Sequence, residues 1–195
     1  MLDSDNAFSD APFLGDNLAL DFINSEYVVE GKRHDTLIDD RSVASWLMRA
    51  GLLSDINDRQ VPDGLLTEAR ELRDAAKIVV NAAINSVPVD LAVINRVLEL
   101  GRPVRKLEWD GDLQQFRIAV YQNATSPSGL LWPIAEALIN LVTSDKFEFV
   151  RQCEAHDCIL WFHDLSKSHR RRWCSMTTCG NRMKVAAFRA RKKPG

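Results

Sequence analysis

Residues 153–182 read CEAHDCILWFHDLSKSHRRRWCSMTTCGNR and contain all four cysteines of the 195-residue chain, Cys153, Cys158, Cys174 and Cys179. Four residues separate the members of each pair, and fifteen residues separate the pairs. Structural Zn²⁺ is bound tetrahedrally by four side chains, and thiolates at about 2.3 Å suit it. Each short loop can supply two such ligands. The spacing therefore predicts one structural zinc ion bound by these four cysteines.

Two disulfides, four unrelated thiols and a catalytic zinc are the alternatives to this site. Disulfides are rare in the cytosol, and the confinement of every cysteine to residues 153–179 argues against unrelated thiols. A catalytic zinc keeps an open coordination position, which four thiolates would close. His156, His163 or His169 could replace one cysteine, although a solvated or hydrogen-bonded histidine is the commoner case.

Composition and charge indicate a globular protein with a basic C-terminal end. The chain has 46% hydrophobic and 27% charged residues and a net charge of −2. Residues 151–195 carry 11 Lys and Arg against 3 Asp and Glu, a balance of +8, which leaves −10 for residues 1–150. A segregated basic end attracts polyanions.

The sequence also gives an expectation about location. The acidic start MLDSDNAFSDAPF lacks the basic and apolar regions of a secretory signal. No apolar run approaches the roughly 20 residues needed to cross a bilayer. We therefore expect a cytoplasmic protein without a membrane partner.

Hydrophobic periodicity predicts an α+β fold. A mainly helical N-terminal domain with a β-hairpin, residues 1–146, would precede a small treble-clef or ribbon-like zinc module, residues 147–195. Residues 13–24 are ambiguous between strand and helix. Helices are expected from the cap Asp40 to Gly51, after Pro62-Asp63, between Pro88 and Gly101, and over residues 130–142.

Three residues of the N-terminal domain carry specific structural expectations. Gly101 would end its helix by adopting a positive φ. Asp110-Gly111 would form the two-residue turn of the hairpin. Pro133 would be tolerable only near the first turn of its helix.

The zinc module is expected to run in the order knuckle, hairpin, knuckle, helix. The spacer ILWFHDLSKSHRRRW, residues 159–173, holds a strand-like stretch and a polar turn, and its aromatic residues Trp161, Phe162 and Trp173 would pack around the metal. Gly180 would let the backbone curl with its amides aimed at sulfur, and Asn181 would cap the final helix.

The segment from Cys174 to Arg182, CSMTTCGNR, closely resembles the CGNR zinc finger. The preceding Cys153-x4-Cys158, the Trp161-Phe162 pair and RRRW at residues 170–173 extend the resemblance over residues 148–192. FLGDNLALDFINS at residues 13–25 resembles the opening motif of the ABATE domain, which precedes this finger in its family. The resemblance implies a bacterial stress-induced transcription regulator whose four cysteines bind zinc and whose finger binds DNA. Arg182, Lys184 and Arg189 occupy the family's basic positions.

A helix over residues 181–193 would have a packed face and a basic face. Met183, Ala186, Ala187 and Ala190 would pack, whereas Arg182, Arg189 and Lys193 would lie on another face. Such arginines could contact phosphates and reach guanine, or could neutralise the thiolates or pair with acidic residues. The candidate nucleic-acid contacts are Arg170, Arg171, Arg172, Arg182, Lys184, Arg189, Arg191 and Lys192. Arg151, Arg172 or Arg182 could also stabilise the charge of the zinc site.

Three classes of function follow from these features. The first is a DNA-binding regulator, and the second is a zinc-stabilised adaptor for protein or RNA, because phosphate attraction does not distinguish the type of nucleic acid. The third is an enzyme, for which Asp21, Glu26, His34 and Asp35 form the only polar cluster we would nominate. The known phosphate-loop, nucleophile-elbow and zinc-enzyme motifs are absent from the sequence, so we expect no catalytic residues.

Two further questions stay open from the sequence. A homodimer is expected because a small finger usually gains affinity by dimerising. A small-molecule effector site in the N-terminal domain would suit a regulator, but no residue points to it.

Overall fold

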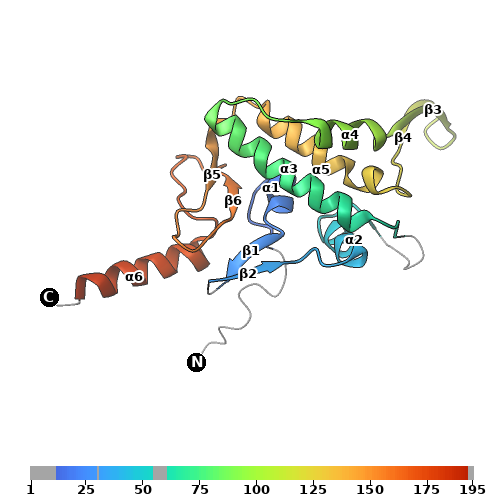
Figure 1. The fold of residues 1–195 in the computed structure, drawn as a ribbon. Coiled ribbons are helices and arrows are strands. Elements are labelled where there is room, and N and C mark those ends of the chain that lie inside the picture. The colour runs from blue at the N-terminus through green and yellow to red at the C-terminus, as the bar shows by residue number, and fades with distance from the viewer. Residues whose placement is uncertain (1–11, 30, 55–60, 193–195) are drawn as a thin grey trace. The chain divides into compact units, whose positions relative to one another are not determined.

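A computed structural model describes residues 12–29, 31–54 and 61–192 of the chain (Figure 1). The outermost residues of the two predicted domains, 1–11 and 193–195, including Lys193 of the predicted basic face, lie outside the described residues. The α-helices in the described part are α1 (Leu18–Ile23), α2 (Asp40–Arg49), α3 (Leu65–Asn85), α4 (Ala92–Leu100), α5 (Pro127–Val142) and α6 (Asn181–Lys192). The strands are β1 (Glu26–Val29), β2 (Lys32–Asp35), β3 (Val104–Asp110), β4 (Gln115–Tyr121), β5 (Val150–Gln152) and β6 (Trp161–His163).

The strands form three separate antiparallel pairs, β1-β2, β3-β4 and β5-β6, within the described ranges. The predicted α+β class is therefore confirmed. The β1-β2 hairpin was not anticipated, and the ambiguous segment at residues 13–24 contains a helix rather than a strand. No described helix is both long enough and apolar enough to span a membrane.

The internal contacts of the chain group it into two compact units. The first unit combines Met1–Thr36 with Ala137–Gly195, and the second is Leu37–Glu136. The division passes through α5. The N-terminal segment thus belongs to the same unit as the cysteines.

In the second unit, the N-cap of α2 lies one residue earlier than predicted, so the helix begins at Asp40 itself. Asp39, not Asp40, is the N-cap: its carboxylate accepts a hydrogen bond from the Ser42 amide at 2.7 Å, and the Ser42 hydroxyl accepts one from the Asp39 amide at 2.9 Å. This reciprocal capping box satisfies two amide donors that the helix itself cannot. The carboxylate of Asp40 is then available to accept a hydrogen bond from the Leu66 amide at 2.6 Å.

Helix α4 ends before Gly101 as predicted, but the reason expected for that glycine and the position expected for Pro133 in α5 were both wrong. Gly101 has a φ of −89°, and glycine is needed there because a Cβ would lie 2.1 Å from the carbonyl oxygen of Ser128. Pro133 lies well inside α5, which begins at Pro127. A proline there leaves the carbonyl four residues earlier without its helical donor, and this carbonyl, of Gly129, accepts a hydrogen bond from Gln122 Nε2 at 3.0 Å.

The predicted β3-β4 hairpin is present, but its turn is longer than two residues. The strands pair from Val104↔Tyr121 to Asp110↔Gln115, which leaves residues 111–114 as a four-residue loop. The Asp110 carboxylate accepts hydrogen bonds from the amides of Asp112 and Leu113, at 3.1 and 3.0 Å. Gln114 has a φ of +49°, and this left-handed residue closes the loop.

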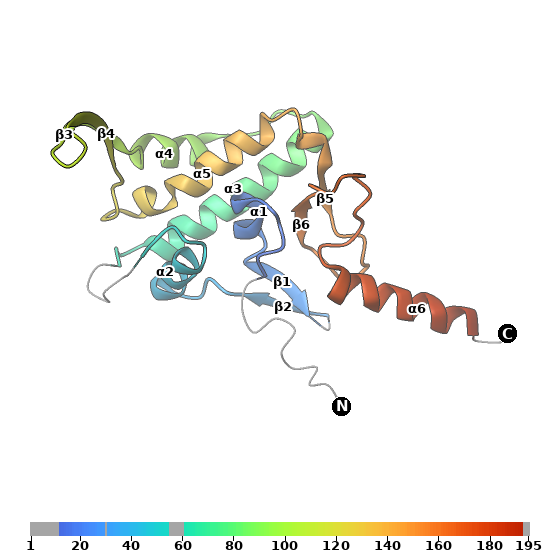
Figure 2. The same cartoon turned by 180° about the vertical axis from the view of Figure 1, so that it is seen from behind.

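The first unit is assembled from both ends of the sequence. Asn17 caps α1 by accepting a hydrogen bond from the Ala19 amide at 2.9 Å, and α1 contributes the buried residues Leu20, Phe22 and Ile23. Strand β6 lies beside α1, as Figures 1 and 2 both show. Sequence-distant segments therefore form the scaffold on which the cysteine loops stand.

Candidate metal centre

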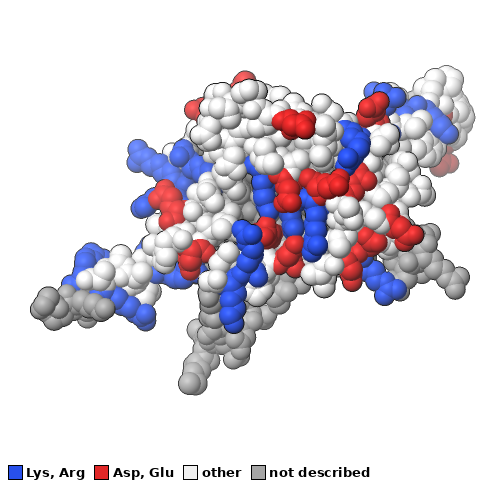
Figure 3. Space-filling view, in the orientation of Figure 1, with Lys and Arg blue, Asp and Glu red and all other residues white. Residues whose placement is uncertain are grey.

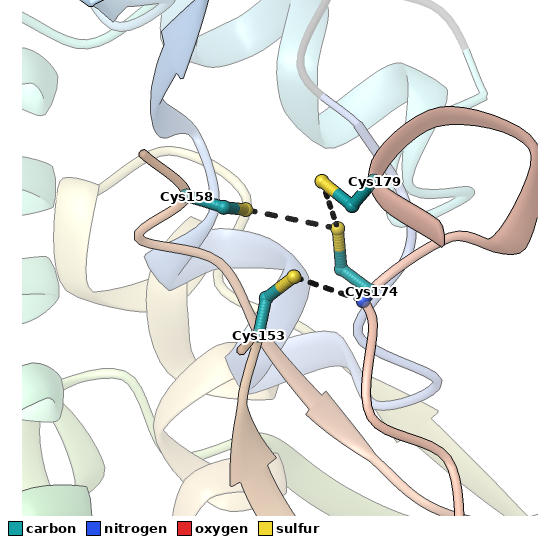
Figure 4. A group of neighbouring side chains, drawn as sticks. All are labelled: Cys153, Cys158, Cys174 and Cys179. Carbon is teal, nitrogen blue, oxygen red and sulfur yellow. Dashed lines mark hydrogen bonds between the residues drawn. The ribbon is translucent and has the colours of Figure 1, made fainter. Parts of the chain in front are cut away.

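The four cysteines come from two short loops of the first unit (Figure 4). Cys153 directly follows β5 and Cys158 precedes β6, so the first pair lies in the loop of the β5-β6 hairpin. Cys174 lies just before the π-helical turn Met176–Gly180, and Cys179 lies within it. This turn leads directly into α6. The predicted elements are present, but the hairpin carries the first cysteine pair rather than occupying the spacer between the pairs.

The sulfur atoms form a cluster of the size that a metal ion requires. All four Sγ atoms lie within 4.8 Å of one another, with Cys158 to Cys174 at 3.8 Å and Cys174 to Cys179 at 3.6 Å. A tetrahedron of sulfurs about 2.3 Å from a central ion has edges of about 3.8 Å. The thiols are free, and these separations are far above the roughly 2.05 Å of a disulfide bond. The cluster therefore fits one zinc ion and not two disulfides.

The electrostatics of the cluster favour a bound cation. Hydrogen bonds from the thiols of Cys158, Cys174 and Cys179 hold the pKa of Cys153 far below its ordinary value. Hydrogen bonds with the thiols of Cys153, Cys158 and Cys179, together with burial, raise the pKa of Cys174 far above its ordinary value. The pKa of Cys179 is also lowered and that of Cys158 is also raised, so ionisation of all four thiols together requires a positive charge among them. A dication supplies that charge.

Backbone hydrogen bonds fix the shape of both loops. The Cys153 amide donates to the Leu160 carbonyl and the Cys158 amide to the Ala155 carbonyl, both at 2.9 Å. The Cys174 amide points at the metal ligand set and donates to Cys153 Sγ at 3.3 Å. Gly180 does not aim its amide at sulfur, as we expected, but donates to the Ser175 carbonyl at 3.0 Å.

Gly180 is buried beside the half-exposed and flexible side chain of Met176, which would have to shift to admit a larger residue. A Cβ there would lie 2.5 Å from Met176 Sδ. Asn181 is the first residue of α6 rather than its cap, and Ser175 caps the preceding turn by accepting a hydrogen bond from the Thr178 amide at 3.3 Å.

The core around the cysteines includes the N-terminal segment of the chain. Tyr27 is buried in one cluster with Phe162 and three of the cysteines, and Leu14, Val29 and Trp173 pack against it. The His163 amide donates to the Gly15 carbonyl at 2.8 Å. Phe162 and Trp173 thus pack near the sulfurs as expected, but residues from before the predicted zinc module complete that core.

Arg171 joins the N-terminal segment to the second cysteine loop. Its guanidinium donates to the carbonyls of Leu14 at 3.1 Å and Trp173 at 3.0 Å, and also to the Cys174 carbonyl and the Asp16 carboxylate. The same group lies 4.3 Å from the centre of the Phe162 ring. Arg171 is therefore a structural residue of the metal centre.

Asp164 organises the loop that carries Arg171. This fully buried carboxylate accepts hydrogen bonds from the Ser166 hydroxyl at 2.6 Å, the Ser166 amide at 3.0 Å and the Arg171 amide at 2.9 Å. Burial alone would raise the pKa of Asp164, but these donors outweigh it and lower the pKa below its ordinary value. Sequence reasoning missed this residue.

The three histidines near the cysteines lie outside the ligand cluster. His163 Nε2 lies 3.1 Å from the Lys146 carbonyl oxygen, and His169 Nδ1 lies 2.9 Å from that of Asp164. The His169 ring also stacks on Phe149 with centroids 3.8 Å apart. His156 is exposed and is not part of the cysteine cluster. The all-cysteine ligand set is the one that the structure brings together.

The other candidate basic residues differ in their surroundings. Arg182 Nη2 lies 3.5 Å from Cys179 Sγ and 2.7 Å from Asp157 Oδ1, so it serves the metal centre, as one of our expectations held. Arg172 pairs with Glu154 at 2.6 Å and covers Trp173. The side chains of Arg182 and Arg172 are both exposed, as are the candidates Arg170, Lys184, Arg189 and Arg191. Lys192 belongs to α6 by its backbone, and its side chain lies outside the described part.

Comparison with known proteins agrees with the geometry. Residues 16–145 match the ABATE family, described as "Putative stress-induced transcription regulator", and residues 150–192 match the CGNR zinc finger. The chain belongs to the ABATE family. No curated protein matched significantly. This ABATE protein therefore carries a CGNR finger whose four cysteines form a zinc site, as predicted.

Three of the four residues nominated for an enzymatic site in this ABATE protein have contacts within the N-terminal segment. Asp21 accepts a hydrogen bond from the Gly15 amide at 2.7 Å. Glu26 pairs with Arg33 at 3.1 Å, and His34 stacks on Tyr27 across the β1-β2 pair. Among the described residues, the four cysteines are the group that could hold a metal ion.

Proposed function

We propose that the chain is a non-catalytic, DNA-binding transcription regulator in which the zinc centre holds α6 as the nucleic-acid contact. The observation that carries the proposal is the exposure of α6. Every residue from Lys184 to Arg191 is exposed, and the helix contains no Asp or Glu. The packed alanine face that the sequence predicted is absent, since Ala186, Ala187 and Ala190 are all exposed and only Met183 is partly buried.

The arrangement of side chains around α6 suits a groove of DNA. At 3.6 residues per turn, the three alanines share one face, with Arg182 and Arg189 on one flank and Lys184 and Arg191 on the other. Small side chains permit close approach to base edges, whereas the two basic flanks can reach phosphates on both sides. Figure 3 shows basic side chains along this helix. A helix of twelve residues is about 18 Å long, which is sufficient to lie in a major groove.

The position of α6 relative to the metal supports the same proposal. Cys179 is separated from the first helical residue, Asn181, only by Gly180. The guanidinium of Arg182 contacts the Cys179 sulfur. The zinc ion would therefore fix the N-terminal end of the basic helix.

The test is fluorescence anisotropy of the zinc-loaded protein with duplex DNA at several salt concentrations. Lys184→Ala combined with Arg189→Ala removes one charge from each flank without touching the metal centre. The expected result is a large loss of affinity and a fall of about 2 in the slope of log K against log salt. Arg96→Ala combined with Arg102→Ala removes the same charge from exposed sites of the second unit and should leave binding unchanged.

The adaptor hypothesis is the second candidate. Val185 and Phe188 are exposed on the face of α6 opposite the alanines, and such residues suit a protein contact. Salt-independent or absent binding to duplex DNA, or stronger binding to RNA of the same length, would favour the adaptor over the DNA-binding regulator.

A further inference from the structure

We propose that the β3-β4 hairpin of the second unit is a dimerisation surface that packs face to face against the same hairpin of a second copy of this chain. The hairpin is amphipathic, with its apolar face turned to solvent. The strand register places Leu107, Trp109, Phe116, Ile118 and Val120 on one face. Their exposed fractions range from 54% for Trp109 to 70% for Leu107.

The opposite face of the hairpin is polar and internally satisfied. Arg117 pairs with Glu108 at 2.8 Å, and the Tyr121 hydroxyl donates to the Glu108 carboxylate. Lys106 lies 5.0 Å from the centre of the Tyr121 ring. Ala119 on this face is buried, whereas nothing in the described part of the chain covers the apolar face. An ordinary surface hairpin has the reverse arrangement, with apolar residues inside and polar residues outside.

The exposed face has the size and rigidity of an interface. Trp109 and Phe116 form an edge-to-face pair with centroids 5.1 Å apart, so the aromatic anchors are already ordered. The five side chains expose roughly 600 Å² together, which is at the upper end of the range for the largest apolar patch of a monomer. Complete burial of two such faces would remove roughly 1,200 Å² from water, which is the lower limit of a specific interface.

The distribution of charge on the hairpin favours a second copy of this chain as the partner that covers the apolar face. Arg105 is the one charged residue on the apolar face, at the end of the hairpin away from the turn, and Asp112 lies in the turn. A twofold axis that runs the two hairpins antiparallel places each Arg105 near Asp112 of the second copy, so the surface is complementary to itself. An isolated two-stranded hairpin is marginally stable in water, and this packing would stabilise it as a four-stranded sandwich.

The experiment is sedimentation equilibrium of the full zinc-loaded chain at about 1 to 100 μM. The wild type should dimerise, and Leu107→Lys combined with Ile118→Lys should raise the dissociation constant by at least about 100-fold because it places charges at the centre of the interface. Ile78→Lys combined with Leu91→Lys adds the same charge at other exposed apolar positions and should leave the dimer intact.

A charge exchange tests the antiparallel arrangement. Arg105→Asp alone should weaken the dimer, and adding Asp112→Arg to the same chain should restore it. Circular dichroism checks that each variant remains folded. A wild type that stays monomeric at 100 μM, or a dimer that survives the Leu107 and Ile118 substitutions, would overturn the proposal. Metal content and DNA affinity are measured separately, so failure here leaves the proposed function standing.

Discussion

The side-chain amide of Asn24 forms two hydrogen bonds with the backbone of Trp161. Its Nδ2 donates to the Trp161 carbonyl at 2.8 Å, and its Oδ1 accepts from the Trp161 amide at 2.8 Å. Both residues are buried. The Asn24 side chain thus bonds to the backbone amide and carbonyl of Trp161 as a neighbouring strand would. It connects the N-terminal segment to β6, the strand that follows the first cysteine pair.

Replacing Asn24 by Ala should therefore destabilise the metal centre. The change leaves a buried amide and a buried carbonyl of Trp161 without partners, at a cost of about 2–4 kcal/mol. The urea concentration at which zinc is released should fall accordingly. Asn81→Ala removes an exposed side-chain amide of α3 that donates to the Lys77 carbonyl. This change should lower the free energy of unfolding by no more than about 0.5 kcal/mol. Equal effects of the two substitutions would contradict this role.

Neighbouring arginines should behave differently. Arg171→Ala removes the donor from the carbonyls of Leu14, Trp173 and Cys174, so we expect a loss of about 2–4 kcal/mol in the stability of the first unit. Arg170→Ala removes an exposed charge and should change stability by less than about 0.5 kcal/mol. Zinc release during urea unfolding measures both. Similar values for the two variants would refute the structural role of Arg171.

Asp21 should make the stability of the protein depend on pH. Burial raises the pKa of Asp21 from 3.8 to about 6, with a contribution from the nearby Asp16 charge, against the hydrogen bond from the Gly15 amide. Since the folded state holds this proton more tightly, the ionised carboxylate costs stability. That cost is absent below about pH 4, grows as the pH rises to about 6, and is constant above it.

Asp21→Asn keeps the acceptor for the Gly15 amide and removes the charge. The variant should be more stable than the wild type at pH 7, and the difference should shrink as the pH falls from 6 to 4. Chemical unfolding at several pH values measures this difference, in which the effect of pH on the metal ligands cancels. Asp74→Asn, at an exposed position on α3, should show no such trend. A pH-independent difference between Asp21→Asn and wild type would disprove the assignment.

Removal of the metal should abolish DNA binding if the proposed function is right. Without the ion, no bonds hold the two cysteine loops to one another, which frees the second cysteine loop and with it the start of α6. Treatment with a strong chelator should therefore raise the dissociation constant for duplex DNA, and added Zn²⁺ should restore it. The Lys184 and Arg189 double variant should keep its zinc while losing DNA affinity. If the metal-free protein bound duplex DNA with unchanged affinity, the proposal that zinc positions α6 for DNA binding would be contradicted.

Local patterns in the sequence predicted much of this structure. The paired cysteines predicted the metal site because two ligands in one short loop are necessarily close in space. Periodicity located α2 to α5, and the alternation around Asp110 located the β3-β4 hairpin. Each of these features depends on residues near one another in the chain.

Long-range relationships were the part that could not be predicted. Nothing local to Asn24, Asp16 or Tyr27 shows that they pack with residues more than 120 positions away. Polar residues in the otherwise apolar run FLGDNLALDFIN were the available signal. The contacts of Arg171 and the exposure of the α6 alanines also depend on tertiary surroundings. The charge of an arginine does not determine whether it donates to a backbone carbonyl or to a phosphate.

The most direct test of the metal centre is zinc X-ray absorption spectroscopy of the purified full chain together with its metal content. Four sulfurs within 4.8 Å of one another predict one zinc per chain, with a first shell of four sulfur atoms at about 2.3 Å. Nitrogen or oxygen atoms in that shell, or a metal-free protein with its cysteines oxidised in pairs, would contradict the account.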